Sequence, residues 1–151
     1  MNANIFKIAA IALILAGCTS SNEEGETLPF TTIGKGILGG GEGISKNDVV
    51  IHTKEEWENL MTAMGSNKMN IFSETEIDFD NYQIIAVFDE VRNNGGWEIV
   101  VTKIKDYNEK IVITVKENAP RGSAVPCIMT QSYHIVKMHA IFKSIEFKHV
   151  K

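Results

Sequence analysis

The pattern that most restricts the fold of this chain lies beyond residue 82, where strand-like segments follow one another to the end. Residues 83–88 form a continuous apolar run, typical of a central strand buried on both faces. Residues 96–104 and 110–116 flank a polar four-residue segment, 106–109, and this arrangement predicts a hairpin. The chain is therefore expected to be mainly β.

Side-chain alternation gives the orientation of the later strands. In 110–116, Ile111, Ile113 and Val115 share one face, which we expect to point into the core. Further strands are predicted near 132–138 and 141–150, the last with its odd-numbered residues inward. The sequence leaves open whether the sheets stack as an antiparallel sandwich or close into a barrel.

One helix is predicted, over residues 54–64, after strands at 30–38 and 49–52. Thr53 and Glu56 have the spacing of a capping box, and Gly65 is a suitable C-terminal stop. One apolar stripe would cover the sheet, formed by Trp57, Leu60, Met61 and Met64. The glycine cluster 39–43 is interpreted as a turn, because neither a Gly-Lys-Ser/Thr motif nor a strong helix follows it, as a phosphate site requires.

The N-terminus resembles a bacterial lipoprotein signal. Lys7 precedes an apolar run from Ile8, which closes on Leu15-Ala16-Gly17-Cys18 and is too short for a permanent span. We expect a signal peptide over 1–17, a lipidated Cys18 that attaches the protein to the membrane, a flexible tether over 18–29 and a single domain over 30–151. The expected location is the bacterial cell envelope, anchored in the outer membrane and facing the periplasm or the exterior. The alternative is an ordinary secretory signal with a chance cysteine.

Composition argues against several other classes. The chain has 15 basic and 19 acidic residues and a net charge of −4, so nucleic acid is not an expected partner. If Cys18 carries lipid, Cys127 is the only thiol left and no internal disulfide is possible. Because Cys127 lies in an apolar stretch, we interpret it as a small hydrophobic residue.

The sequence shows no organised catalytic or metal-binding group. His134 and His139 are five residues apart, which directs them to opposite faces of a strand. None of the serines lies in a Gly-x-Ser-x-Gly elbow. The acidic pairs Asp89 with Glu90 and Asp78 with Asp80 are interpreted as an exposed rim. We therefore expect no enzyme activity, no cofactor and no metal site.

Two segments between the predicted strands are candidate recognition loops. Residues 92–97 combine Arg, Asn and two glycines with a large aromatic, and residues 119–126 carry two prolines around Gly-Ser. Trp97 is either an interface anchor or a core residue. Aromatic and arginine side chains contribute most of the energy in typical interfaces. The candidate partner-binding residues are Arg92, Asn94, Gly95, Gly96, Trp97, Pro120, Arg121, Gly122 and Tyr133.

Several of these segments resemble the C-terminal domain of the protease complex subunit PrcB. The matching residues are Phe79-Asp80, Ala86-Val87-Phe88, Gly95-Gly96-Trp97-Glu98-Ile99, 112–117, Pro120, Gly122 and 130–137. The resemblance extends over about 49–137. Ser132 stands where the family usually has proline, and Cys127 also departs from the family pattern. The resemblance implies a non-catalytic envelope accessory protein that binds or stabilises a surface protease complex.

Two alternatives to an accessory subunit remain open. A protease inhibitor would insert the Gly-rich and Pro-rich loops into an active-site cleft. An envelope glycan-binding protein would use exposed aromatic residues as a platform.

Overall fold

A computed structural model describes residues 24–65, 72–122 and 126–151. The predicted signal peptide, Cys18 and loop residues 123–125 lie outside this range. The elements, in chain order, are β1 (Glu26–Thr27), β2 (Thr31–Leu38), β3 (Asn47–Ile51), α1 (Lys54–Met64), β4 (Tyr82–Phe88), β5 (Glu98–Asp106), β6 (Lys110–Asn118), β7 (Gln131–His139) and β8 (Ser144–Val150).

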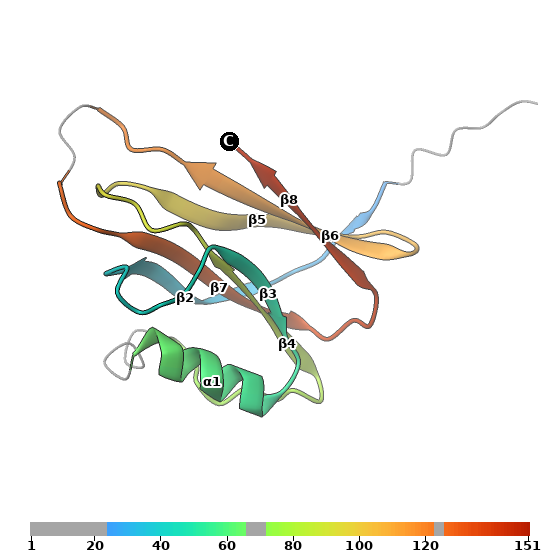
Figure 1. Cartoon of the computed structure of the whole chain (residues 1–151). Coiled ribbons are helices and arrows are strands. Elements are labelled where there is room, and N and C mark those ends of the chain that lie inside the picture. Colours follow the sequence, from blue (N-terminus) through green and yellow to red (C-terminus); the bar gives the residue numbers. More distant parts are fainter. Residues whose placement is uncertain (1–23, 66–71, 123–125) are drawn as a thin grey trace, which may run out of the picture.

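The strands form two stacked sheets (Figure 1). The helix-covered sheet has the order β2-β7-β4-β3, and all its neighbours are antiparallel. The outer sheet has the order β1-β5-β6-β8, in which β6 and β8 are parallel. The expected mainly β fold with one helix is confirmed, and the architecture is sandwich-like, since the described strands do not close into a barrel.

The inner core lies between the two sheets. It contains Ile85 and Val87 of β4 together with the odd-numbered residues of β6, Ile111, Ile113 and Val115, which are all 0% exposed. The inward face of β8 is the odd-numbered one, as expected, because Ile145 and Phe147 pack against this cluster. Alternation thus correctly predicts the buried side of the outer sheet.

A second core lies between α1 and the helix-covered sheet. Trp57, Met61 and Met64 are buried there against Ile84 and Phe88, on the opposite face of β4 from Ile85. The capping box forms as predicted: the Glu56 N–H donates to Thr53 Oγ1, and the Glu56 carboxylate accepts the Thr53 N–H. β4 is therefore buried on both faces, which explains its unbroken apolar sequence.

The N-terminal boundary differs from the expected tether. Glu26 and Thr27 pair with Asp106 and Lys105 of β5, and the Leu28 N–H donates to the Ile104 carbonyl at 2.9 Å. Leu28 also packs against the inner core. Ordered structure therefore starts before residue 30, because this segment completes the edge of β5. No helix in the described ranges is long and apolar enough to cross a membrane.

Candidate protein-binding site

The two predicted recognition loops lie side by side. The Gly95 N–H donates to the Pro126 carbonyl at 2.9 Å. Gly96 has φ +88°, and a Cβ built there would lie 2.8 Å from Cβ of Pro120. The glycine is required both by its backbone conformation and by this close approach. The loop after β4 and the loop after β6 thus form one surface at one end of the sandwich.

A short backbone ladder fixes the base of this surface, which lies at the left in Figure 1. The Arg92 N–H donates to the Thr130 carbonyl at 2.7 Å, and the Thr130 N–H donates back to the Arg92 carbonyl at 2.9 Å. The Thr130 hydroxyl also donates to the Asn94 carbonyl at 2.8 Å. The loop is therefore tied to the start of β7 on both sides of Asn93.

Trp97 is half-buried at the start of β5, outside both core clusters. Its indole N–H donates to Asn94 Oδ1 at 3.0 Å, and the Arg92 guanidinium carbon lies 3.9 Å from the ring centroid. Such a cation–π contact contributes about 1 kcal/mol. Of the two interpretations open from the sequence, the structure favours a partly exposed side chain that is held in one orientation.

Two open grooves flank Trp97. The larger, about 580 Å³, lies between β2 and the two loops and is lined by Lys35, Gly36, Ile37, Gly96, Trp97, Glu98, Asn118, Ala119, Arg121 and Ser132. The second, about 470 Å³, lies at the ends of β6 and β8 and is lined by Trp97, Lys116, Glu117, Asn118, Ala119, Arg121 and Lys151. Trp97 and Arg121 belong to both, so they stand on the ridge between the grooves.

Exposed apolar residues lie near the same end. Val91 is 39% exposed, Ile128 58% and Met129 54%, and a Cβ at Gly40 would contact both Val91 and Met129. Ile37, 49% exposed, lines the larger groove. Cys127 is exposed rather than buried as an apolar residue, because it lies in this surface segment. Large exposed apolar patches commonly mark interaction sites.

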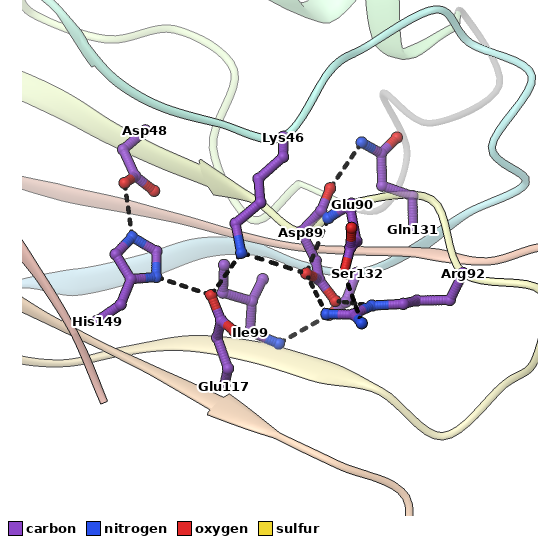
Figure 2. Close-up of polar contacts among 10 residues, drawn as sticks. All are labelled: Lys46, Asp48, Asp89, Glu90, Arg92, Ile99, Glu117, Gln131, Ser132 and His149. Carbon is purple, nitrogen blue, oxygen red and sulfur yellow. Dashed lines mark hydrogen bonds and ion pairs between the residues drawn. The ribbon is translucent and has the colours of Figure 1, made fainter. Parts of the chain in front are cut away.

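A polar network holds the Arg92 side chain in place (Figure 2). Arg92 Nη2 and Nε donate to the two carboxylate oxygens of Asp89 at 3.0 and 3.1 Å, and Nη1 lies 2.6 Å from Glu90 Oε1. Asp89 is only 2% exposed, and its carbonyl accepts the Gln131 side-chain amide at 2.9 Å. The hydrogen bond to Asp89 raises the pKa of Arg92 further above its ordinary value. Arg92 is therefore an internal positioning residue for Trp97.

The network continues across one edge of the sandwich as the ionic seam, comprising Lys46, Asp48, Asp89, Glu117 and His149 (Figure 2). Lys46 Nζ lies 2.7 Å from Glu117 Oε1 and 3.9 Å from Asp89 Oδ1. His149 lies between carboxylates, with Nε2 2.7 Å from Asp48 and Nδ1 2.9 Å from Glu117. These contacts join β3 of the helix-covered sheet to β6 and β8 of the outer sheet.

Charges in the ionic seam stabilise one another. The hydrogen bond with Glu117 raises the pKa of Lys46, and the same bond lowers the pKa of Glu117. Burial lowers the pKa of His149, but hydrogen bonds and charges from Asp48 and Glu117 outweigh it, so that pKa lies above its ordinary value. The protonated imidazole is therefore the form that this edge favours.

The opposite edge has a neutral seam, comprising Thr32, Ile99, Val101, Ser132 and His134. Two side chains of β7 accept backbone N–H groups of β5: Ser132 Oγ from Ile99 at 3.0 Å, and His134 Nδ1 from Val101 at 2.9 Å. His134 Nε2, which must then carry the proton, donates to Thr32 Oγ1 at 2.8 Å. Burial, followed by the nearby charge of Lys35, lowers the pKa of His134 to about 4. These hydrogen bonds satisfy backbone N–H groups on the side of β5 that faces away from β6, which would otherwise have no acceptor in the sheet.

Two further sequence-based expectations are wrong. Tyr133, predicted as an anchor, is 0% exposed and belongs to the core beneath α1, because it faces the opposite side of β7 from Ser132. Asp89 was expected in an exposed acidic rim but is 2% exposed, because Arg92 neutralises it. Asp78, by contrast, is exposed and caps its own turn by accepting the Asp80 N–H at 3.1 Å.

The remaining predicted residues lie together around Trp97. Asn94, Gly95, Gly96 and Pro120 set the loop geometry, while Arg121 and Gly122 are exposed. Sequence reasoning missed the residues of both seams, which come from distant segments that no local pattern connects. Within the described ranges, there is no cluster of three or more His, Cys, Asp or Glu residues able to hold a metal ion.

A comparison with protein families agrees with the resemblance seen in the sequence. Residues 83–139 match the family model described as PrcB C-terminal. The matched segment runs from β4 to the end of β7, and it includes both loops and Trp97. The elements outside the match are β1, β2, β3, α1 and β8, and the match is narrower than the 49–137 resemblance. No curated protein and no solved structure matches the chain.

Proposed function

We propose that this chain is a non-catalytic accessory module that binds a protein of a protease complex through the surface around Trp97. The observation that supports this most directly is the orientation of Trp97 by Arg92 and Asn94 between two open grooves. A large aromatic side chain held rigidly at a surface loses little conformational freedom on binding, which is typical of interface anchors. The PrcB match includes Trp97 and the loops on either side of it, and this family resemblance suggests an accessory subunit associated with a protease complex.

The proposed setting is the cell envelope. The Leu15-Ala16-Gly17-Cys18 motif supports cleavage before Cys18 and lipidation of its thiol. One acyl chain holds a protein only marginally, whereas two or more on one residue give durable attachment. The Cys18→Ala variant should remain as unprocessed precursor or leave the membrane fraction. A Cys18→Ala variant that is processed normally and stays in the membrane fraction would contradict the anchor and leave the binding surface untouched.

Site-specific photocrosslinking in the native envelope tests the binding surface. A photoreactive residue at position 119, an exposed site that lines both grooves, should crosslink to a subunit of a protease complex, identified by mass spectrometry. The control position is 54, an exposed site on α1, which covers the other sheet and lines neither groove. Crosslinks to the same protein from both positions, or from neither, would reject the surface around Trp97.

A pair of aromatic truncations completes the test. Trp97→Ala should reduce the crosslink at position 119 by about ten-fold, the effect of losing one anchor residue. The matched control is Phe142→Ala, because Phe142 is 90% exposed and lies after β7, at the opposite end of the sandwich. Near-ultraviolet circular dichroism should show that both variants stay folded. A full crosslink in folded Trp97→Ala would remove Trp97 from the site.

A further inference from the structure

The smaller groove beside Trp97 carries an excess of positive charge. Lys116, Arg121 and Lys151 line it, and within the described ranges none of the three has an ion-pair partner. The whole chain has a net charge of −4, so this local surplus runs against the overall balance. Unpaired cations around an aromatic side chain favour an anionic ligand with apolar parts.

The carboxylates near these cations are already engaged. Glu117 Oε1 accepts from Lys46 and also contacts His149 in the ionic seam. In the larger groove, Glu98 pairs with Lys35 at 2.8 Å and accepts the Asn118 amide at 2.9 Å. The hydrogen bond from Lys35 lowers the pKa of Glu98, so it stays ionised and paired. These acids therefore do not neutralise Lys116, Arg121 or Lys151.

The shape of the surface favours an extended segment over a compact ligand. Two grooves meet at the Trp97 and Arg121 ridge, and each is open to solvent. Ile128 and Met129 are exposed and follow closely after Pro126, whose carbonyl accepts the Gly95 N–H. A peptide that alternates acidic and apolar side chains could place its acids on the three cations and its apolar residues on this ridge.

We propose that the groove formed by Trp97, Lys116, Arg121 and Lys151 binds an extended acidic segment of the partner protein. The inference rests on the proposed function and specifies the chemistry of the partner at that site. Arg121 has the central role, because it borders both grooves and its guanidinium can hold a carboxylate through two hydrogen bonds.

Titration with a defined peptide tests this inference directly. The probe is a peptide of roughly ten residues that alternates Glu with Val and Leu, a length that spans one strand-like site. The matched control peptide has Gln in place of every Glu. The readout is the pair of tryptophan indole signals in a nitrogen–proton correlation spectrum of the full chain. Trp97 should shift, whereas Trp57, which is 1% exposed and donates to the Thr75 carbonyl, should not.

Charge variants separate this site from general attraction. We expect saturable binding that is about ten-fold weaker for the Gln peptide and about ten-fold weaker for Arg121→Glu or Lys116→Glu. Lys54→Glu makes the same charge change at an exposed site on α1, far from the groove, and should alter the affinity by less than about two-fold. Equal affinity for the two peptides, no shift of Trp97, or an equal loss in Lys54→Glu would overturn the inference.

The crosslinking experiment distinguishes this inference from the proposed function. If Trp97→Ala reduces the crosslink at position 119 and Lys116→Glu preserves it, the protein-binding surface stands and the acidic-segment inference fails. If position 119 gives no crosslink that position 54 lacks, the proposed function fails as well. Stronger binding to vesicles of anionic lipid than to the acidic peptide would also overturn the inference, because the groove would then serve a membrane surface.

Discussion

The neutral seam and the ionic seam join the same two sheets at opposite edges, yet they use opposite chemistry. In the neutral seam, uncharged Ser132 and His134 accept backbone N–H groups of β5. In the ionic seam, Lys46 and His149 connect carboxylates on β3 and β6, and their side chains are 43% and 31% exposed. Water screens the second arrangement but hardly reaches the first. We therefore expect stability to depend mainly on the neutral seam.

Acid should reveal the largest difference between the seams. His134 has a folded-state pKa of about 4, below the ordinary 6.5, so the unfolded chain takes up the proton first. Its contribution is complete above pH 6.5 and is lost as the pH falls toward 4, by up to about 3 kcal/mol. His149, whose pKa is raised, has the opposite dependence: its contribution is present below pH 6.5 and is lost as the pH rises through its folded-state value. Urea unfolding at a series of pH values measures the sum of the His134 and His149 contributions to the free energy of unfolding.

Variants assign this pH dependence to one residue. His134→Leu should remove most of the loss between pH 6.5 and about pH 5, whereas His149→Leu should leave it in place. The same loss in His134→Leu as in the unchanged protein would show that another group titrates in this window. Below about pH 4.5 the ionised Glu98 and Glu117, whose pKa values are lowered, add their own losses.

Direct removal of His134 should have the next largest effect. At neutral pH, His134→Leu leaves the Val101 N–H buried without an acceptor and should lower the free energy of unfolding by about 2 kcal/mol. Lys46→Met in the ionic seam should cost less than about 1 kcal/mol, because its pairs are partly exposed. Chemical denaturation measures the loss in the free energy of unfolding for each of the two variants. An equal or larger cost for Lys46→Met would reverse our ranking of the seams.

Gln83 shows what a neutral buried group does without partners. It is 0% exposed, and neither its Nε2 nor its Oε1 has a hydrogen-bond partner in the described structure. Gln83→Leu should raise the free energy of unfolding by about 1 kcal/mol, because the cost of burying an unpaired amide is removed. Gln131→Leu is the contrasting variant and should destabilise the protein, since its amide donates to the Ile44 and Asp89 carbonyls. A loss of stability in Gln83→Leu would indicate that its amide is satisfied in solution.

Salt should have the smallest effect. Raising NaCl to about 0.5 M shortens the screening length to a few ångströms and should weaken the partly exposed ion pairs, with the ionic seam losing less than about 1 kcal/mol and the neutral seam almost nothing. In the Lys46→Met background the same change should shift the urea midpoint by less than in the unchanged protein. A comparable salt response with and without Lys46 would place the sensitive charges elsewhere.

Local patterns predicted the elements but not their assembly. The capping box at Thr53, the apolar run of β4 and the alternation in β6 each depend on neighbouring residues, so the sequence displays them directly. The parallel pairing of β8 with β6 was not predicted, because it depends on how the chain crosses between sheets after β7. The two loops at Trp97 were identified from their Gly, Pro and aromatic content, which is also a local signal.

The errors in the candidate site have the same origin. Tyr133 and Ser132 are adjacent in sequence but lie on opposite faces of β7. Only the packing of α1 determines that the Tyr133 side is the one covered by the helix. Arg92 looked like a free cation because its neutralising partner, Asp89, could not be known to be buried. Whether one member of an ion pair is buried depends on the tertiary structure. That burial determines whether the other member, here Arg92, can bind a partner protein.

The placement of β2 has a consequence for how the molecule matures. Within the described structure β2 pairs only with β7, and the bond between Thr32 and His134 spans 102 residues. During synthesis or export the N-terminus emerges first. The helix-covered sheet therefore cannot form until β7, near the end of the chain, has also emerged. Folding should therefore be slow and should occur late, in a single concerted stage, as is usual where sequence-distant contacts dominate. If the polypeptide is exported as we propose, this delay keeps it unfolded while it crosses the membrane. The Trp97 surface then assembles only after translocation is complete.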